Sequence, residues 1–220
     1  MINISYKQIK KLFLKTIITF MFKTDTPLLN GISKFISNFF NPLVSLFLYF
    51  LYSSLENYTA KEAAMRFLPI LLLTMLPISL WIFWNVKKGN YTNMDVSNRN
   101  QRKSLYFFIA GAIGAYLLYD YLKNGTVDIL MIFLMILLLV MQISNYFVKS
   151  SMHTAFNIFV SALFFSINPV MGIIWFGIAV LVGITRIILK RHTLKEVISG
   201  AVIAGIVSFI YLYTNIQMQH

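Results

Sequence analysis

Residues 185–200 hold the side chains best suited to nucleophilic chemistry. His192 and Glu196 are four residues apart, so on a helix their side chains lie one above the other. The Glu196 carboxylate can then accept a hydrogen bond from one ring nitrogen of His192, which fixes the tautomer and makes the other nitrogen a better nucleophile or base. Arg186 adds a guanidinium suited to phosphate oxygens. The alternative interpretation is a basic loop beside a membrane in which the spacing of His192 and Glu196 is incidental. This segment alone does not distinguish a catalytic pair from such a loop.

A second polar stretch, residues 149–154, contains another histidine. Ser150 or Ser151 can cap a following helix, whose exposed N–H groups and positive dipole end favour an anion. His153 in the first turn would be placed as a general acid beside that anion, with Lys149 close by. Taken alone, the stretch is explained as well by an ordinary helix cap followed by an interfacial histidine.

The third polar stretch, residues 95–103, is basic. Arg99, Arg102 and Lys103 share one helical face and could clamp phosphate, although a positive-inside anchor explains them equally well. Together the stretches combine histidines with guanidinium groups, which favours metal-free phosphoryl transfer through a phosphohistidine. A metal is weakly supported, because the acids near this face are few. No cofactor is expected.

The elements that must position these residues are membrane helices. Of the 220 residues, 58% are hydrophobic and only 12% are charged, whereas soluble domains carry about 25% charged residues. The mean hydropathy is +0.72, and a crossing needs about 20 mostly apolar residues. We therefore predict an all-α fold, a polytopic transmembrane bundle that forms a single domain over residues 34–220. The chain has no cysteine, which excludes disulfides.

The expected bundle has six to seven spans. They cover residues 35–53, 67–86, 104–122, 127–147, 153–167, 170–188 and 194–213. The three polar stretches follow the second, fourth and sixth spans. Each pair of crossings returns the chain to the same side, so all three stretches can converge there. Gly200 and Gly205 are interpreted as small residues for helix packing.

The N-terminal segment, residues 1–33, is not expected to cross the membrane. Apolar residues recur at helical spacing over residues 6–22, and Lys7, Lys11 and Lys15 line the opposite face. This pattern predicts an amphipathic helix that lies in the headgroup region. A signal peptide is the competing interpretation, but Lys15 interrupts its apolar core and no small-residue cleavage site follows.

The formal charge of +12 gives information on the partners of the chain and on its orientation in the membrane. Nucleic acid is not expected as a partner, because the basic residues lie in short loops between spans; the bilayer and a phosphorylated substrate explain them better. Lys61, Arg66 and Lys123 are the basic residues on the face opposite the polar stretches. This bias predicts a cytoplasmic N-terminus and a cytoplasmic-facing site in the cell (inner) membrane. The sequence leaves the oligomeric state open.

The polar stretches resemble the motifs of the type 2 phosphatidic acid phosphatases, a superfamily shared with vanadium haloperoxidases. The third family motif is Ser-Arg, five residues, His, three residues, Asp, and this chain has Thr185 and Arg186, then His192, then Glu196. The second motif, Pro-Ser-Gly-His, corresponds to residues 150–153. The order of the motifs and their placement on one side also agree with the family.

The first motif departs from the family pattern of a Lys, six residues and Arg-Pro. Arg102 fits it, but Lys103 replaces the Pro and Asp95 stands where the Lys belongs. The resemblance implies that His192 attacks phosphorus, that Glu196 orients His192, and that His153 protonates the leaving oxygen. The residues that it implies for phosphate binding are Arg186, Arg102 and Ser151, with Arg99 or Lys149 supplying the missing positive charge.

The implied activity is hydrolysis of a lipid phosphate or diphosphate. Polyprenyl diphosphate, phosphatidic acid and phosphatidylglycerophosphate are the candidate substrates, with a polyprenyl or diphosphate substrate favoured. One alternative is a lipid phosphotransferase that passes the phosphoryl group from the same histidine to an alcohol. Another is a non-enzymatic transport or scaffold protein with decayed motifs, although Asp120 and Asp128 lie near span ends and not at midspan, where transporters usually carry charge.

Overall fold

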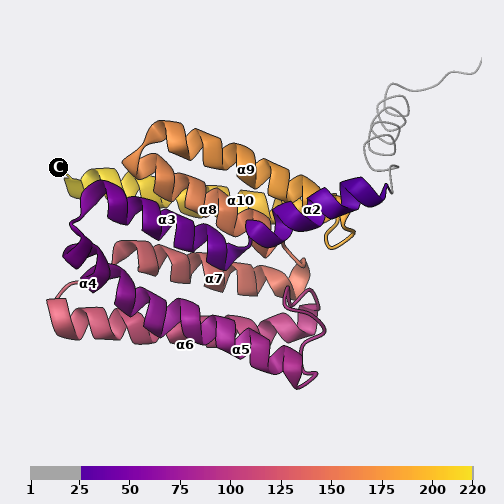
Figure 1. Ribbon diagram of the computed structural model, residues 1–220, viewed down its shortest axis with the longest axis horizontal. Helices are drawn as coiled ribbons and strands as arrows, with labels where there is room; N and C mark the ends of the chain where they lie inside the picture. Colours follow the sequence, from indigo (N-terminus) through magenta and orange to yellow (C-terminus); the bar gives the residue numbers. More distant parts are fainter. Residues whose placement is uncertain (1–25, 220) are drawn as a thin grey trace, which may run out of the picture.

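The computed structural model describes residues 26–219, and the regular structure in that part of the chain is helical (Figure 1). The helices are α2 (Pro27–Phe39), α3 (Pro42–Asn57), α4 (Ala60–Ile70), the π-helical segment η1 (Leu71–Met75), α5 (Leu76–Lys87), α6 (Arg99–Asn124), α7 (Ile129–Phe147), α8 (Met152–Ile167), α9 (Pro169–Ile188) and α10 (Leu194–Gln219). The all-α prediction is confirmed for these residues. The expected amphipathic helix over residues 6–22 lies outside them.

Five of the described helical stretches are long and apolar enough to cross a membrane, namely the continuous α4–η1–α5, α6, α7, α9 and α10. A sixth is counted if α2 and α3 form one span, although they are bent by 56° at the break between them. The break falls where Asn41 caps α3 through its side chain and Pro42 occupies the first helical turn. The unbroken span expected over residues 35–53 is therefore two helices.

Helix α8 explains why the structure supports five or six spans and not seven. It covers the expected span 153–167, but with 16 residues it is short for a crossing. It is nevertheless central, because most of its side chains are buried and it packs against α3, α9 and α10. A Cβ atom on Gly172 of α9 would lie 2.6 Å from the Cα of Phe165, so α8 and α9 need a glycine at this contact.

The stretch α4–η1–α5 contains two prolines that cannot donate backbone hydrogen bonds. Pro69 lies in α4 and Pro77 in the first turn of α5, and the π-helical segment Leu71–Met75 lies between them. The Thr74 hydroxyl donates to the Ile70 carbonyl at 2.6 Å within this segment. The helix thus stays continuous where the regular hydrogen-bond ladder is disturbed.

The bundle has two chemically different ends. Loops 88–98, 148–151 and 189–193 meet at one end, on the right of Figure 1, and we call it the site end. The α3–α4 junction and the α6–α7 loop lie at the opposite end, which we call the far end. The convergence of the three polar stretches is thereby confirmed.

Candidate active site

His192 is buried in the loop before α10, and both of its ring nitrogens have partners. Nδ1 lies 3.0 Å from Oε2 of Glu196, and Nε2 lies 3.2 Å from Nη2 of Arg102. A guanidinium can only donate, so Nε2 accepts and Nδ1–H donates to Glu196. The same Glu196 oxygen accepts from the Thr193 N–H at 3.0 Å, which ties the carboxylate to the start of α10. The expected pairing of His192 with Glu196 is confirmed.

The electrostatic surroundings of His192 keep it neutral. Burial, followed by the charges of Arg102 and Arg186, lowers the pKa of His192 to about 2. At neutral pH the imidazole therefore has no proton on Nε2, and the lone pair there accepts the hydrogen bond from Arg102. That is the protonation state a nucleophilic histidine requires.

Arg102 connects the three polar stretches. It lies in the first turn of α6 and is only 2% exposed. Its Nε donates to the Val96 carbonyl and its Nη1 to the Ser150 carbonyl, both at 3.0 Å, while Nη2 faces His192. A buried guanidinium needs such partners, and these bonds place its positive charge directly beside Nε2 of His192.

Arg186, in the last turn of α9, is the second buried guanidinium and is also 2% exposed. Its Nη1 donates to the Ser37 hydroxyl at 2.9 Å and its Nη2 to a carboxylate oxygen of Asp95, while its buried Nε has no partner. The other carboxylate oxygen of Asp95 lies 3.2 Å from Nε2 of His153. Asp95 therefore contacts a predicted phosphate ligand and the predicted general acid at once.

These contacts of Asp95 were not predicted. In the sequence, Asp95 marked only the absence of a positive charge. Burial raises the pKa of the Asp95 carboxyl, but His153 and Arg186 outweigh that effect and hold the pKa below its usual value. The side chain is thus an anion inside the cluster. Ser37 was missed as well, because no motif singles out a serine in α2.

Of the other predicted phosphate ligands, Ser151 and Lys149 lie at the cluster and Arg99 lies outside it. Ser151 caps α8 by accepting from the Thr154 N–H, and its own N–H donates to the Glu196 carbonyl at 2.9 Å. Lys149 donates to the Arg191 carbonyl at 3.1 Å, and burial lowers its pKa.

Arg99, the alternative to Lys149 for the missing positive charge, makes its contact away from the cluster. Its Nε donates to the Asn145 carbonyl at the end of α7, so its guanidinium belongs to the contact between α6 and α7. Arg102, one turn further along the same helix, takes the inward position instead. Within residues 26–219, no group of three or more His, Cys, Asp or Glu side chains is placed to hold a metal ion.

Gly200 brings the two histidine segments together. A Cβ atom at this position would lie 2.6 Å from the Ser151 carbonyl oxygen and 3.1 Å from its nitrogen. Helix α10 can therefore approach the start of α8 only with a glycine here. This confirms the packing role expected for Gly200, whereas a Cβ atom at Gly205 would meet nothing within 4 Å, so the same expectation for Gly205 is wrong. The close approach at Gly200 also explains how His153 in α8 and His192 in the loop before α10 belong to one site.

A mainly apolar cavity of about 470 Å³ extends from this cluster into the bundle. Asp95 and His153 line it at the site end, and Phe50 and Ile70 line it deeper in the bundle. Its remaining walls come chiefly from α3, η1, α5, α6 and α7. We call this cavity the apolar groove.

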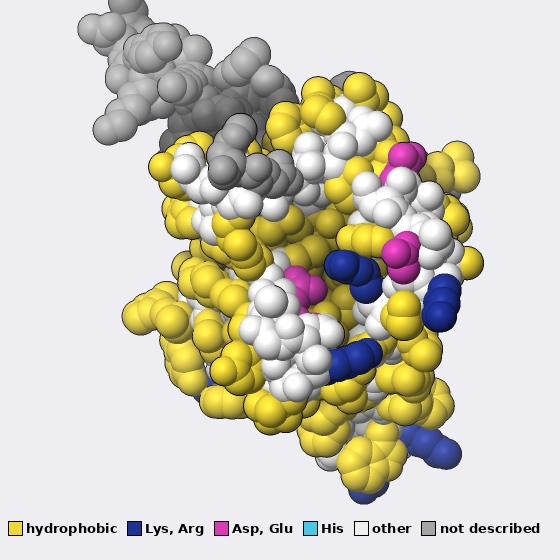
Figure 2. All heavy atoms as spheres, turned by 90° about the vertical axis from the view of Figure 1, so that its left-hand side faces the viewer, with side chains coloured by type: hydrophobic (Ala, Val, Ile, Leu, Met, Phe, Trp, Pro, Cys, Tyr) yellow, Lys and Arg dark blue, Asp and Glu magenta, His cyan; other side chains and the backbone are white. Residues whose placement is uncertain are grey.

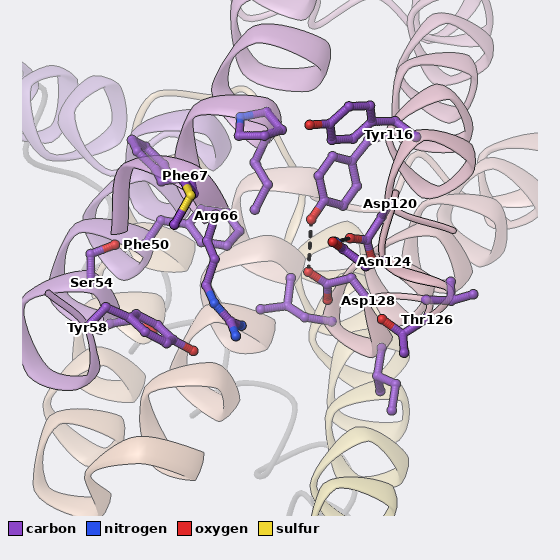
Figure 3. Close-up of a pocket in the computed structure, with 18 of the residues that line it drawn as sticks. Phe50, Ser54, Tyr58, Arg66, Phe67, Tyr116, Asp120, Asn124, Thr126 and Asp128 are labelled. Carbon is purple, nitrogen blue, oxygen red and sulfur yellow. Dashed lines mark hydrogen bonds between the residues drawn. The ribbon is translucent and has the colours of Figure 1, made fainter. Parts of the chain in front are cut away.

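The far end holds a larger cavity, of about 780 Å³. Figure 2 shows side chains of both charge signs around the hollow at this end, over a hydrophobic floor. In Figure 3, Arg66 reaches in from one wall, while Tyr116 on the other wall donates to Asp128 at 3.3 Å. No histidine occurs among the described residues that line this far cavity.

Comparison with known proteins finds no family model, curated protein or solved structure that matches the chain. A function must therefore be inferred from the side chains themselves. The site end holds a neutral, oriented histidine, a second histidine and two buried guanidinium groups. The pair of guanidiniums suits an anion with several oxygens, and the first histidine suits attack on its central atom.

Proposed function

We propose that the chain is a membrane-embedded lipid phosphatase of the type 2 phosphatidic acid phosphatase kind, which works through a phosphohistidine on His192. The observation that supports this most is the contact of Nε2 of His192 with a buried guanidinium while Nδ1 is held by Glu196. A histidine oriented by a carboxylate is a typical activated nucleophile. An arginine beside the unprotonated nitrogen of such a histidine is where a phosphoryl group would be bound.

The proposed reaction has two steps. Nε2 of His192 attacks phosphorus, the bond from phosphorus to the lipid oxygen breaks, and a protonated His153 gives that oxygen its proton. Burial lowers the pKa of His153 to about 3 in the free site, so in this proposal His153 takes up the proton as the anionic substrate binds. Water then attacks the phosphohistidine, His153 takes the proton of the water, and release of phosphate restores His192. Glu196 stabilises the positive charge that forms on the His192 ring in the first step.

The phosphoryl oxygens are assigned to Arg102 and Arg186 in this proposal. Both guanidiniums are buried and held by hydrogen bonds, so they keep their places when negative charge develops in the transition state. Ser151 contributes through the start of α8, where the helix dipole favours an anion. Lys149 adds a positive charge at the edge of the same cluster.

A lipid substrate is favoured by the apolar groove. The groove leads from His153 toward the middle of the bundle, so a tail can lie in it while the phosphate reaches the histidines. Polyprenyl diphosphate is the favoured substrate, and phosphatidic acid and phosphatidylglycerophosphate are the other candidates. For a diphosphate the leaving group is the lipid monophosphate, and for a monophosphate it is the lipid alcohol.

The decisive experiment measures phosphate release by the purified full chain in detergent, over a panel of lipid phosphates and with EDTA present. We expect release that depends on both His192 and His153. Transfer of phosphate to an added alcohol in place of release would identify a phosphotransferase. Absence of turnover on every lipid would favour a transport or scaffold protein.

The site is proposed to face the cytoplasm of a cell (inner) membrane. The far end carries Lys61, Arg66 and Lys123, whereas the other described basic residues lie toward the site end. The chain has no cysteine, so a single S97C substitution provides a specific label in loop 88–98. Reaction of that cysteine with an impermeant thiol reagent in intact cells would contradict this orientation.

A further inference from the structure

Asp95 lies where an anionic ligand would be expected. Its carboxylate contacts Nη2 of Arg186 through one oxygen and lies 3.2 Å from Nε2 of His153 through the other. In the proposed reaction these two side chains hold the phosphoryl group and protonate the leaving oxygen. A phosphate dianion and this carboxylate cannot share such close partners, because two anions at that separation repel each other strongly.

The loop around Asp95 is held in a conformation that directs the carboxylate inward. Val96 has a φ of 44°, which β-branched residues rarely adopt. The Val96 side chain is buried, and its carbonyl accepts from Nε of Arg102 at 3.0 Å. Burial and this hydrogen bond keep the strained turn in place beside the cluster.

Asp95 is nevertheless the partner that can leave. Its side chain is 18% exposed, compared with 2% for Arg186, so the carboxylate can turn toward water while the guanidinium cannot. The pair also leaves the buried Nε of Arg186 without an acceptor. A phosphate has more acceptor oxygens than a carboxylate and could satisfy that donor as well.

We propose that the Asp95 carboxylate is a resident anion of the phosphoryl site, and that a substrate phosphate must displace it from Arg186 and His153. Asp95 is thus a specificity-determining residue that weakens the binding of every phosphate. A lipid phosphate tolerates this competition because its tail holds the phosphate beside the site at a high effective concentration. A soluble phosphate lacks that advantage, so Asp95 selects lipid phosphates over soluble ones. This inference rests on the proposed function.

The test measures binding of inorganic phosphate to the purified full chain in detergent by titration calorimetry. We expect the parent chain to bind phosphate weakly and Asp95→Asn, which keeps the shape but removes the charge, to bind it at least about tenfold more tightly. Asp95→Ser is a second neutral variant, so the test does not depend on the folding of one protein. Asp95→Glu keeps the charge and is expected to bind phosphate as weakly as the parent chain.

The matched control is Asp120→Asn, which removes a carboxylate from the far cavity. It should bind phosphate like the parent chain. Weaker or unchanged phosphate binding in both neutral variants, with folding verified by thermal unfolding, would overturn the proposal.

The outcome for Asp95 can be separated from the outcome for the enzyme activity, because phosphate binding requires no turnover. Tighter binding in Asp95→Asn without hydrolysis of any lipid would support the resident anion and contradict the phosphatase. Hydrolysis that requires His192, combined with unchanged phosphate affinity in the neutral variants, would do the reverse. In an active enzyme, Asp95→Asn should also lower the KM for a soluble phosphate ester more than the KM for a lipid phosphate.

Discussion

The two ends of the bundle are both hollowed, but they differ in how their charges are held. The far cavity is larger, at about 780 Å³ against about 470 Å³ for the apolar groove. At the far end the Arg66 side chain is exposed and lies over the Tyr58 ring at 4.6 Å. At the site end Arg102 and Arg186 are each only 2% exposed. Burying a charge is costly, so guanidiniums kept inside a protein indicate chemistry better than the size of a cavity does.

The two ends also differ in the kinds of reactive side chain that they contain. The site end holds His192 and His153, each beside a carboxylate. The far cavity offers tyrosines, Asp120 and Asp128, but no group among its described lining that is neutral, oriented and nucleophilic at pH 7. Proton and phosphoryl transfer need such a group. Substitutions matched between the two ends can therefore test whether function is confined to one of them.

The largest effect is expected for His192→Ala. Loss of the nucleophile should reduce phosphate release from the best lipid substrate by at least about 10³-fold, whereas Arg66→Gln at the far end should stay within about twofold of the parent rate. The measurement is phosphate release in detergent with EDTA. Turnover that survives His192→Ala, or a similar loss of turnover in Arg66→Gln, would contradict the assignment of catalysis to the site end alone.

His153→Ala should cost about 10²- to 10⁴-fold, because a general acid contributes that much to a proton transfer. The loss should be smaller for an aryl phosphate than for a lipid phosphate, since a good leaving group needs no proton. The rates on both substrates give the comparison. An equal loss on both would argue that His153 holds the site together and does not act as the acid.

Two glycines of α10 provide a matched test of packing. Gly200→Ala places a Cβ atom 2.6 Å from the Ser151 carbonyl oxygen, whereas a Cβ atom at Gly205 meets nothing within 4 Å. We expect Gly200→Ala to lower the free energy of unfolding by about 1–3 kcal/mol and to reduce activity, and Gly205→Ala to do neither. Thermal unfolding in detergent and the lipid assay measure both effects. Equal behaviour of the two variants would show that α8 and α10 do not meet as described.

The buried imidazole of His192 should make stability depend on pH. Its pKa is lowered to about 2 in the folded chain, while the unfolded chain has the ordinary value of about 6.5. Below pH 6.5 the unfolded state therefore takes up a proton on His192 that the folded state does not. His192 has no effect on the free energy of unfolding above that pH and lowers it progressively as the pH drops. The expected slope is up to about 1.4 kcal/mol per pH unit. His192→Asn should flatten the decline in unfolding free energy between pH 6.5 and pH 5, and an unchanged slope would contradict the burial of His192.

The smallest effect is expected for Asp128→Asn at the far end. Burial raises the pKa of this carboxyl, so its ionised form is disfavoured in the folded chain. The neutral amide can still cap α7 by accepting from the Met131 N–H, as Asp128 does at 3.2 Å. The variant should match or exceed the stability of the parent chain at pH 7 by at most about 1 kcal/mol, with unchanged activity. A clear loss of activity would extend function to the far end.

Local patterns were sufficient to predict much of this molecule. The short spacing of His192 and Glu196 predicted their contact, although His192 lies in the loop before α10 and only Glu196 lies in the helix. The order of the apolar stretches also predicted that loops 88–98, 148–151 and 189–193 lie at one end, because each pair of crossings returns the chain to the same side. The helical class followed from composition and hydropathy.

Contacts between segments far apart in the sequence could not be predicted from local patterns. The bond from Arg186 to Asp95 joins residues 91 positions apart, and the bond from Arg186 to Ser37 joins residues 149 apart. Such contacts depend on how the helices pack and rotate. The same applies to Arg99 and Arg102, which share a predicted face, although only Arg102 turns toward His192. The bend at Pro42 was missed because a proline early in a helix can belong to a continuous span or begin a new one.

Phe50 and Ile70 line both the apolar groove and the far cavity, so these two buried side chains stand between the hollows at opposite ends of the bundle. An ion that moved from one hollow to the other would have to give up its hydration beside a phenyl ring and an aliphatic chain, which is prohibitively unfavourable. An apolar pair between the hollows therefore suits a bundle whose helices are long and apolar enough to cross a membrane, because it places no polar group where the two hollows meet.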